Sequence, residues 1–248
     1  MLTEQRYDLI LKLLEEKKSI TVTEVKELLN TSESTVRRDI TALHNAGRLV
    51  KVFGGAVASD ANYVTKEPTV AQKSGINKEE KAAVARYAAS LMEPDDFVYL
   101  DAGTTTGCML DYVTDRSITF VTNAVAHAQK LASLGFKVYL VGGELKSSTE
   151  AVVGSQAMLT LKEYHFTKGF FGTNGISKTG GFTTPDMNEA LIKKTAMAQC
   201  RKSFLLSDHT KFGNVSSVTF APFQGVTILT DSMPEEYKDC KNIIRCEK

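Results

Sequence analysis

The sequence predicts an α/β protein that combines a small N-terminal domain with a larger domain built on a mostly parallel sheet. Three observations predict this architecture. Helical periodicity followed by a β-hairpin pattern fills residues 1–58. From residue 77 onward, short apolar runs alternate with helical stretches. The length of 248 residues lies near the upper limit of a single hydrophobic core, so two domains are expected.

Three helices are predicted in the first domain. The first covers about residues 3–16, where apolar side chains recur at helical spacing (Tyr7, Ile10, Leu11 and Leu14). The segment 21–24 has the spacing of a capping box and starts the second helix, whose apolar face is formed by Val25, Leu28 and Leu29. The third helix follows the polar turn 30–32, where the Ser32 hydroxyl can cap it, and Gly47 ends it.

The third helix has an apolar inner face and a polar outer face. Its inner face is formed at helical spacing by Val36, Ile40 and Leu43. A basic segment, 48–53, follows the helix and is turned by the pair Gly54 and Gly55. This order of elements is typical of a winged helix-turn-helix, whose recognition helix enters the major groove of DNA.

Charge supports DNA binding locally, although the net charge of the whole chain is only +1. Residues 34–58 carry four basic side chains and a single acid, Asp39, so one face is basic. We expect the two arginines of the recognition helix to contact bases and phosphates of the DNA, and the basic residues of the wing to contact the DNA backbone. The alternative is a generic helical pair with a solvated basic face. The expected DNA-binding residues are Ser32, Ser34, Thr35, Arg37, Arg38, Arg48 and Lys51.

The composition excludes several classes of protein. Hydrophobic residues make up 42% and charged residues 24%, as in ordinary globular proteins. No apolar run is long enough for a membrane helix, and the N-terminus lacks the apolar stretch of a signal peptide. The four cysteines show neither zinc-ligand spacing nor CxxC pairing, so we expect reduced thiols in a cytoplasmic protein, with a 240–246 disulfide as the alternative. We expect no metal and no cofactor.

The second domain, 77–248, is predicted to contain a mostly parallel sheet covered on both faces. The segment 59–76 is polar and without a sustained period, which favours a linker. Buried strands are predicted at 97–100, 118–121, 137–141, 168–171, 203–206 and 226–229. Helices are predicted at about 77–92, 104–114, 124–134, 155–163 and 186–201.

A glycine- and threonine-rich turn follows the first of these strands. Asp101 starts the turn, Gly103 frees backbone amides, and hydroxyls follow on Thr104, Thr105 and Thr106. Amides and hydroxyls at the start of a helix suit a phosphate group. The alternative is an ordinary strand-to-helix turn, in which the same residue types act as caps.

Polar residues also follow other strands, and ligands of open α/β sheets bind at the carboxyl ends of strands. These residues predict a site for an anionic, polyhydroxy small molecule, with Lys211 as the cation. Glu189 can line this pocket or form a simple surface pair with Lys193, four residues on. For the four histidines we expect structural or solvent-exposed roles. The further pocket candidates are Asn123, Gly142, Gly143, Asn174, Glu189 and Lys211.

The whole chain resembles the DeoR family, also called the GlpR type, of bacterial transcriptional repressors. Its DNA-binding signature matches Ser34-Thr-Val-Arg-Arg-Asp-Ile and Gly54-Gly-Ala56. Its sensor domain matches Asn77-x-x-x-Lys81, Asp101-Ala-Gly-Thr-Thr, Phe171-Gly-Thr-Asn-Gly and Asp208-x-x-Lys-Phe-Gly213. The wing departs from the family pattern, with Lys51 and Phe53 where the family usually has Arg and His.

The resemblance implies a C-terminal sensor domain that resembles ribose-5-phosphate isomerase in fold and binds phosphorylated sugars or sugar alcohols. In those isomerases the turn equivalent to 172–175 carries catalytic aspartates, and this sequence has no acid there. We therefore expect a homo-oligomeric repressor, dimer or tetramer, that binds operator DNA and a sugar phosphate without converting the sugar. Fructose 1-phosphate is the favoured effector and tagatose 6-phosphate the second. The alternative is a sugar-phosphate isomerase with an appended DNA-binding domain.

Overall fold

A computed structural model describes residues 2–17, 19–52, 54–58, 62–64 and 69–247. The chain divides into two compact units. The first unit comprises 1–65, 174–185 and 213–223, and the second comprises 66–173, 186–212 and 224–248. Two short segments of the predicted sensor domain, 174–185 and 213–223, therefore group with the N-terminal residues.

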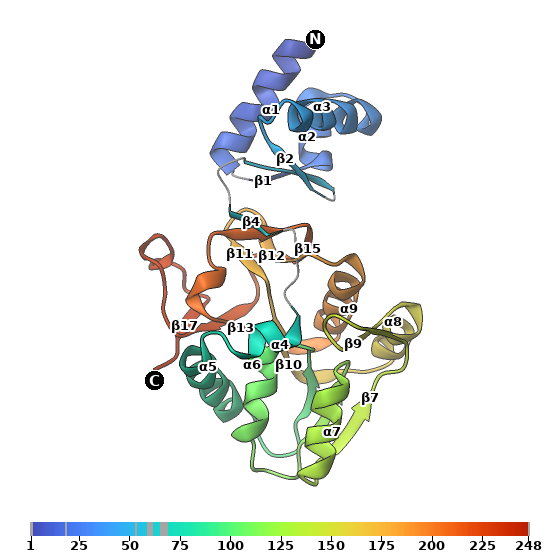
Figure 1. Ribbon diagram of the computed structural model, residues 1–248, viewed down its shortest axis with the longest axis vertical. Coiled ribbons are helices and arrows are strands. Elements are labelled where there is room, and N and C mark those ends of the chain that lie inside the picture. The colour runs from blue at the N-terminus through green and yellow to red at the C-terminus, as the bar shows by residue number, and fades with distance from the viewer. Residues whose placement is uncertain (1, 18, 53, 59–61, 65–68, 248) are drawn as a thin grey trace. The chain divides into compact units, whose positions relative to one another are not determined.

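The N-terminal part of the first unit is the expected winged helix-turn-helix. Its helices are α1 (Thr3–Lys17), α2 (Val22–Leu29) and α3 (Glu33–Asn45), and its strands are β1 (Ser19–Thr21), β2 (Val50–Val52) and β3 (Gly55–Val57) (Figure 1). The three strands form an antiparallel sheet in the order β1-β3-β2. The buried core contains the apolar side chains predicted to face inward, among them Ile10, Leu14, Val36, Ile40 and Leu43.

The predicted caps of this domain are confirmed. Thr21 and Glu24 form a capping box at the start of α2. The Ser32 hydroxyl accepts the Thr35 amide at 3.3 Å and so caps α3. Gly55 is the first residue of β3 rather than part of the turn, and a Cβ there would lie 1.9 Å from the Ile20 carbonyl oxygen. Only glycine allows β1 and β3 to approach this closely.

A buried ion pair anchors the recognition helix α3 to α1. The Arg6 guanidinium donates two hydrogen bonds to the Asp39 carboxylate, at 2.6 and 3.0 Å, and Asp39 is only 2% exposed. Such a fork-shaped pair fixes orientation as well as distance. The one acid of the basic segment thus has a structural role, which leaves the outer face of α3 basic.

The remaining strands of the first unit form two small sheets. In one, β11 (Gly175–Ser177), β12 (Gly181–Thr184) and β15 (Val218–Ala221) are antiparallel. In the other, β4 (Asn62–Val64) pairs in parallel with β14 (Asn214–Ser216). The ring of Phe182 packs against those of Phe220 and Phe223. The predicted linker 59–76 therefore contains a strand, and it also contains α4 (Val70–Ser74), which Thr69 and Gln72 cap.

The second unit contains a seven-stranded, fully parallel sheet in the order β17-β16-β13-β10-β5-β6-β7. All six predicted strands occur in it, and β17 is an additional one. Because every strand runs in the same direction, all carboxyl ends lie at one edge. The strands are β5 (Phe97–Leu100), β6 (Thr119–Thr122), β7 (Lys137–Leu140), β10 (Phe166–Gly172), β13 (Cys200–Ser207), β16 (Thr227–Thr230) and β17 (Ile243–Arg245).

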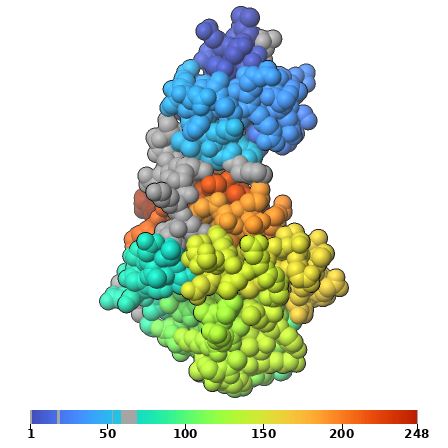
Figure 2. Space-filling model, turned by 45° about the vertical axis from the view of Figure 1, so that its right-hand side comes forward, coloured from blue at the N-terminus to red at the C-terminus, as the bar shows by residue number. Residues whose placement is uncertain are grey.

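Helices cover both faces of this sheet, as predicted (Figure 1). One face packs against α5 (Lys78–Ser90), the 3-10 turn η1 (Met109–Asp111) and α7 (Val125–Ser133). On the other face, α9 (Met187–Ala198) packs against β10 and β13, and α8 (Ser155–Lys162) packs on α9. Helices α7 and α8, yellow-green and yellow, lie on the surface of this unit in Figure 2.

Three shorter elements complete the second unit. Helix α6 (Thr104–Cys108) follows β5 directly and continues into η1. A hairpin of β8 (Glu144–Lys146) and β9 (Ala151–Val153) follows β7. Two more 3-10 turns are η2 (His209–Lys211) and η3 (Glu235–Tyr237). The helix predicted to reach residue 201 ends at Ala198, because Cys200 already begins β13. Within the described residues, no helix has the length and apolar character needed to span a membrane.

Candidate functional site

The predicted DNA-reading side chains lie at the N-terminal half of α3. Arg37 and Arg38 are both exposed, and Arg37 is held by Glu33 one turn earlier at 3.3 Å. The hydroxyls of Ser34 and Thr35 lie 2.9 and 3.0 Å from the Ser32 hydroxyl. Ser32 is therefore committed to the helix cap. Of the two arginines, Arg37 is paired with an acid, whereas Arg38 has no acidic partner within the described residues.

The wing supplies two further basic residues. Arg48 and Lys51 are exposed, and the Lys51 ammonium donates to the Thr41 hydroxyl at 2.9 Å. This bond holds Lys51 beside the recognition helix, at its outer face. Phe53, where the wing departs from the family pattern, lies outside the described residues.

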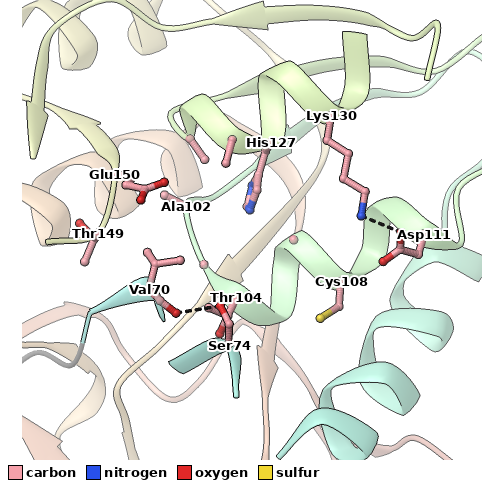
Figure 3. A pocket seen from close by; sticks show the side chains of 14 residues that line it. Val70, Ser74, Ala102, Thr104, Cys108, Asp111, His127, Lys130, Thr149 and Glu150 are labelled. Carbon is pink, nitrogen blue, oxygen red and sulfur yellow. Dashed lines mark hydrogen bonds and ion pairs between the residues drawn. The ribbon is translucent and has the colours of Figure 1, made fainter. Parts of the chain in front are cut away.

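The second candidate site is a pocket of about 260 Å³ at the carboxyl edge of the sheet (Figure 3). Its volume lies below the roughly 300–1,000 Å³ of drug-sized ligand pockets, so it suits a small ligand. It is formed by α4, by the turn after β5 with α6 and η1, by α7 and by the β8–β9 loop. The lining residues are Val70, Ser74, Ala102, Gly103, Thr104, Gly107, Cys108, Asp111, Ala124, Ala126, His127, Lys130, Thr149 and Glu150.

The turn after β5 brings Gly103 and Thr104 into this pocket. Thr106, in contrast, is fully buried, and its hydroxyl donates to the carbonyl oxygens of Asp101 and Gly103 at 2.8 and 2.9 Å. Its hydroxyl thus shapes the turn from inside. Thr105 is partly exposed and does not line the pocket.

Asn123 supports the same turn from the neighbouring strand. Its side-chain oxygen accepts the Ala102 amide and the Tyr99 hydroxyl, each at 3.0 Å. Its side-chain nitrogen donates to the Val152 carbonyl at 3.2 Å, and the residue is 2% exposed. Asn123 therefore ties the turn after β5 to the β8–β9 hairpin.

A buried ion pair begins at Asp101, the residue before Ala102 of the pocket wall. Asp101 is 1% exposed and Lys193 is 4% exposed, and their side chains are hydrogen-bonded. The same carboxylate accepts the Gly172 amide at 2.9 Å, and Lys193 donates to the Gly172 carbonyl at 3.2 Å. Burial raises the pKa of Asp101, and Lys193 and the Gly172 amide act in the opposite direction. The pair joins the ends of β5 and β10 to α9.

Glu189 lies in a polar cluster next to this pair. It accepts the Thr149 hydroxyl at 2.5 Å and the Lys146 ammonium at 2.9 Å, and Lys146 also reaches Asp186 at 3.2 Å. Burial favours a higher pKa for Glu189, but Lys193, Thr149 and Lys146 together lower the pKa below its usual value. Glu189 is 7% exposed, so the interpretation of Glu189 and Lys193 as a simple surface pair is wrong.

The other predicted residues lie at several places. Gly142 and Gly143 are exposed in the turn between β7 and β8. Lys211 is half-buried in η2, near Asp208. Burial favours a higher pKa for Asp208, but hydrogen bonds from Thr210 and the charge of Lys211 lower that pKa below its usual value. Asn174 belongs to the other compact unit, where its side-chain oxygen accepts the Thr184 hydroxyl at 3.2 Å.

Among the residues in or near the pocket that the sequence did not predict as site residues, two have a lowered pKa. Lys81 on α5 is 5% exposed, and it donates to the Lys73 carbonyl on α4. Burial lowers the pKa of Lys81, while the Asp208 carboxylate opposes this shift. Lys81 also interacts electrostatically with Cys108, which lines the pocket. A basic residue at a buried position of an otherwise apolar helix face was the available signal.

The second missed residue is His127 on α7. A Cβ at Gly107 would lie 2.8 Å from His127 Nε2, so a glycine in α6 makes room for the ring. The ring hydrogen-bonds the Gly103 backbone, and Nδ1 has no partner among the described residues. Burial lowers the pKa of His127 to about 4, so the ring is neutral at pH 7.

This pKa predicts a loss of stability in mild acid. The unfolded chain takes up a proton near pH 6.5 and the folded chain only near pH 4, so stability is lost as pH falls from about 6.5 towards 4. We expect a loss of about 2 kcal/mol between pH 7.5 and pH 5 from this residue alone. Urea unfolding at both pH values measures this loss of unfolding free energy. The loss should be absent in His127→Gln and unchanged in His165→Gln, which alters an exposed histidine and serves as the control. Equal pH dependence in all three proteins would contradict the lowered pKa of His127.

The comparisons with known proteins agree with the two-part architecture. Residues 6–62 match the model of the DeoR-like helix-turn-helix domain, and residues 76–232 match that of the DeoR C-terminal sensor domain. Among solved structures, ribose 5-phosphate isomerase A of Methanocaldococcus jannaschii is similar with a TM-score of 0.40 and 14% identity, over 55% of each chain.

Two curated relatives span nearly the whole chain. An uncharacterized HTH-type transcriptional regulator of Bacillus subtilis (strain 168), FruR, is 40% identical over 236 residues, which are 95% of this chain and 93% of the relative. A lactose phosphotransferase system repressor of Staphylococcus aureus (strain N315) is 35% identical over 237 residues, 94% of each chain. The chain therefore belongs to the DeoR family of DNA-binding transcriptional repressors of sugar metabolism.

Proposed function

We propose that this repressor is regulated by a sugar phosphate that binds in the pocket at the carboxyl edge of the sheet. The observation that carries the proposal is the meeting of Gly103 and Thr104 with the start of α7 in one small pocket. A backbone turn and a hydroxyl are the groups that usually hold a phosphate. Lys130 lines the same pocket, and Lys81 and Lys211 add positive charge nearby.

The pocket and the names of two relatives together support a choice of effector. The names of the two relatives refer to FruR and to a lactose phosphotransferase system. We propose fructose 1-phosphate as the effector and tagatose 6-phosphate as the second choice. The protein is proposed to act in the cytoplasm as a homo-oligomer, because winged helices commonly read paired half-sites as symmetric assemblies.

We further propose that the sugar phosphate is bound without being converted. Isomerisation needs a placed carboxylate that is free to accept a proton. The two buried carboxylates are already bound, Glu189 by Lys146 and Thr149 and Asp101 by Lys193. The turn 172–175 carries no acid, and Glu150, which lines the pocket without a partner among the described residues, lies on an exposed hairpin loop. Effector binding would instead shift the population of protein conformations between states of high and low operator affinity.

The test is the matched pair Thr104→Val and Thr105→Val. Thr104 lines the pocket and its neighbour Thr105 does not, so only the first substitution removes a hydroxyl from the site. We expect Thr104→Val to weaken fructose 1-phosphate binding about tenfold, as lost hydrogen bonds to charged groups do, with operator affinity unchanged. Calorimetric titration with fructose 1-phosphate and with fructose measures this, and the sugar phosphate should be recovered unconverted. Equal affinity for the free sugar, or equal effects of both variants, would overturn the proposed phosphate site.

A further inference from the structure

Glu150 has an unusual backbone conformation for its residue type. It is the last residue of the loop between β8 and β9, and its amide donates to the Lys146 carbonyl at 2.9 Å to close the hairpin. Its φ angle is +54°, in the left-handed region. Hairpin loops of this kind favour Gly or Asn at such a position, because a Cβ crowds the backbone there and the short Asn side chain can hydrogen-bond locally. The chain carries a glutamate instead, which indicates a use for its side chain.

The position of Glu150 indicates what that use is. Its exposed side chain lines the pocket, on the side opposite to Asp111, and Thr104 and His127 lie between the two (Figure 3). Asp111 is paired with Lys130 at 2.6 Å. Glu150, in contrast, has no ion pair and no side-chain hydrogen bond within the part of the chain that the structure describes. It is therefore the carboxylate of this pocket whose charge is not compensated.

The loop that carries Glu150 is anchored on both sides. Its neighbour Thr149 is buried and bonded to Glu189 at 2.5 Å, and the Ser148 carbonyl accepts the Val70 amide of α4 at 3.3 Å. After the loop, the Val152 amide donates to the Asn123 carbonyl at 2.6 Å. These contacts hold the backbone of Glu150 at a defined place in the pocket wall.

We propose that Glu150 is a specificity-determining residue that selects a sugar carrying one phosphate and rejects a sugar carrying two. An ionised carboxylate only accepts hydrogen bonds, so it pairs well with the hydroxyl donors of a sugar. The same charge repels a second phosphate, and an unpaired charge of this kind is a common means of excluding a wrong ligand. This inference rests on the proposed binding of a sugar phosphate at the turn that contains Gly103 and Thr104.

The experiment compares fructose 1-phosphate with fructose 1,6-bisphosphate on the full-length protein. Glu150→Gln keeps the shape of the side chain and removes its charge. Glu144→Gln removes the same charge from an exposed residue of the same hairpin that does not line the pocket, and it is the matched control. We expect the wild type to bind the monophosphate at least about 100-fold more tightly, because like charges in contact oppose binding strongly. Glu150→Gln should reduce this ratio about tenfold or more, and Glu144→Gln should leave it unchanged.

A second variant separates the role of the side chain from a general effect on folding. Glu150→Gly relieves the backbone strain, so its thermal midpoint should equal or exceed that of the wild type. It should nevertheless bind fructose 1-phosphate about tenfold more weakly, because the hydroxyl contact is lost. If the wild type binds neither sugar phosphate, the proposed effector function fails and the role of Glu150 with it. If it binds fructose 1-phosphate and Glu150→Gln leaves the ratio as Glu144→Gln does, the role of Glu150 alone is overturned.

Discussion

Replacing Asp101 by alanine is expected to lower the free energy of unfolding of the α/β unit by about 3–5 kcal/mol. The substitution leaves the Lys193 ammonium buried at 4% exposure without its carboxylate partner. It also removes the acceptor of the Gly172 amide. Removing the hydrogen-bonded carboxylate of a buried ammonium is among the costliest results of a single substitution, so the effect should exceed that of truncating a side chain that lines the pocket.

Two further proteins make this measurement specific. Asp111→Ala breaks the exposed pair with Lys130, whose side chains are 63% and 41% exposed, and should cost only about 0–1 kcal/mol. The double variant Asp101→Leu with Lys193→Met removes both charges and should recover most of the loss. Urea unfolding followed by circular dichroism gives the three values. If Asp101→Ala costs no more than Asp111→Ala, the pair does not stabilise the sheet edge.

The winged helix-turn-helix could be predicted almost completely, because its signals are local. The Ser32 cap, the Thr21–Glu24 capping box and the apolar spacing of Ile40 and Leu43 each act within a few residues of chain. The parallel sheet was predictable for a related reason, since buried strands and amphipathic helices alternate regularly. The elements missed beyond residue 58 are short and lie in segments without a clear period: helix α4 and the strands β4, β8, β9, β11, β12, β14, β15 and β17.

The sequence was less informative about which polar groups remain free at the sheet edge. The pattern after β5 shows three threonines, but the structure divides them into a pocket hydroxyl on Thr104 and an internal one on Thr106. Asn123 likewise follows a strand end as expected, yet its amide is used within the protein. These differences depend on distances between elements far apart in the chain, which strand-end rules do not contain.

Three charged or titratable residues in or near the pocket that the sequence missed come from elements other than the strand ends. His127 faces the pocket from α7, and Glu150 from a hairpin loop. Lys81 lies on α5, a helix whose place over the pocket-forming α6 follows only from the tertiary fold. For Glu150, the informative signal is a backbone angle that conflicts with the residue type, and only a structure shows it.

Replacing Arg38 by alanine is expected to lower the affinity for the specific operator by about 5- to 150-fold. This range corresponds to the roughly 1–3 kcal/mol that one base-reading arginine contributes. Arg38 lies near the start of α3 and is exposed, and no acid competes for it among the described residues, whereas Arg37 is held by Glu33. Of the two, Arg38 should therefore have the larger effect. Lys12→Ala removes one charge from an exposed position on α1 and serves as the control.

Lys51 is expected to behave differently, because we assign it to the DNA backbone. Its ammonium is held next to α3 by Thr41 rather than at the tip of the recognition helix. Lys51→Ala should weaken binding to specific and unrelated DNA by the same factor, and the slope of log affinity against log salt should fall by about one. Fluorescence anisotropy at several salt concentrations, with operator and scrambled duplexes, measures both effects. An Arg38→Ala protein that loses affinity equally for both duplexes would show that Arg38 contacts phosphates and that the bases are read elsewhere on the recognition helix.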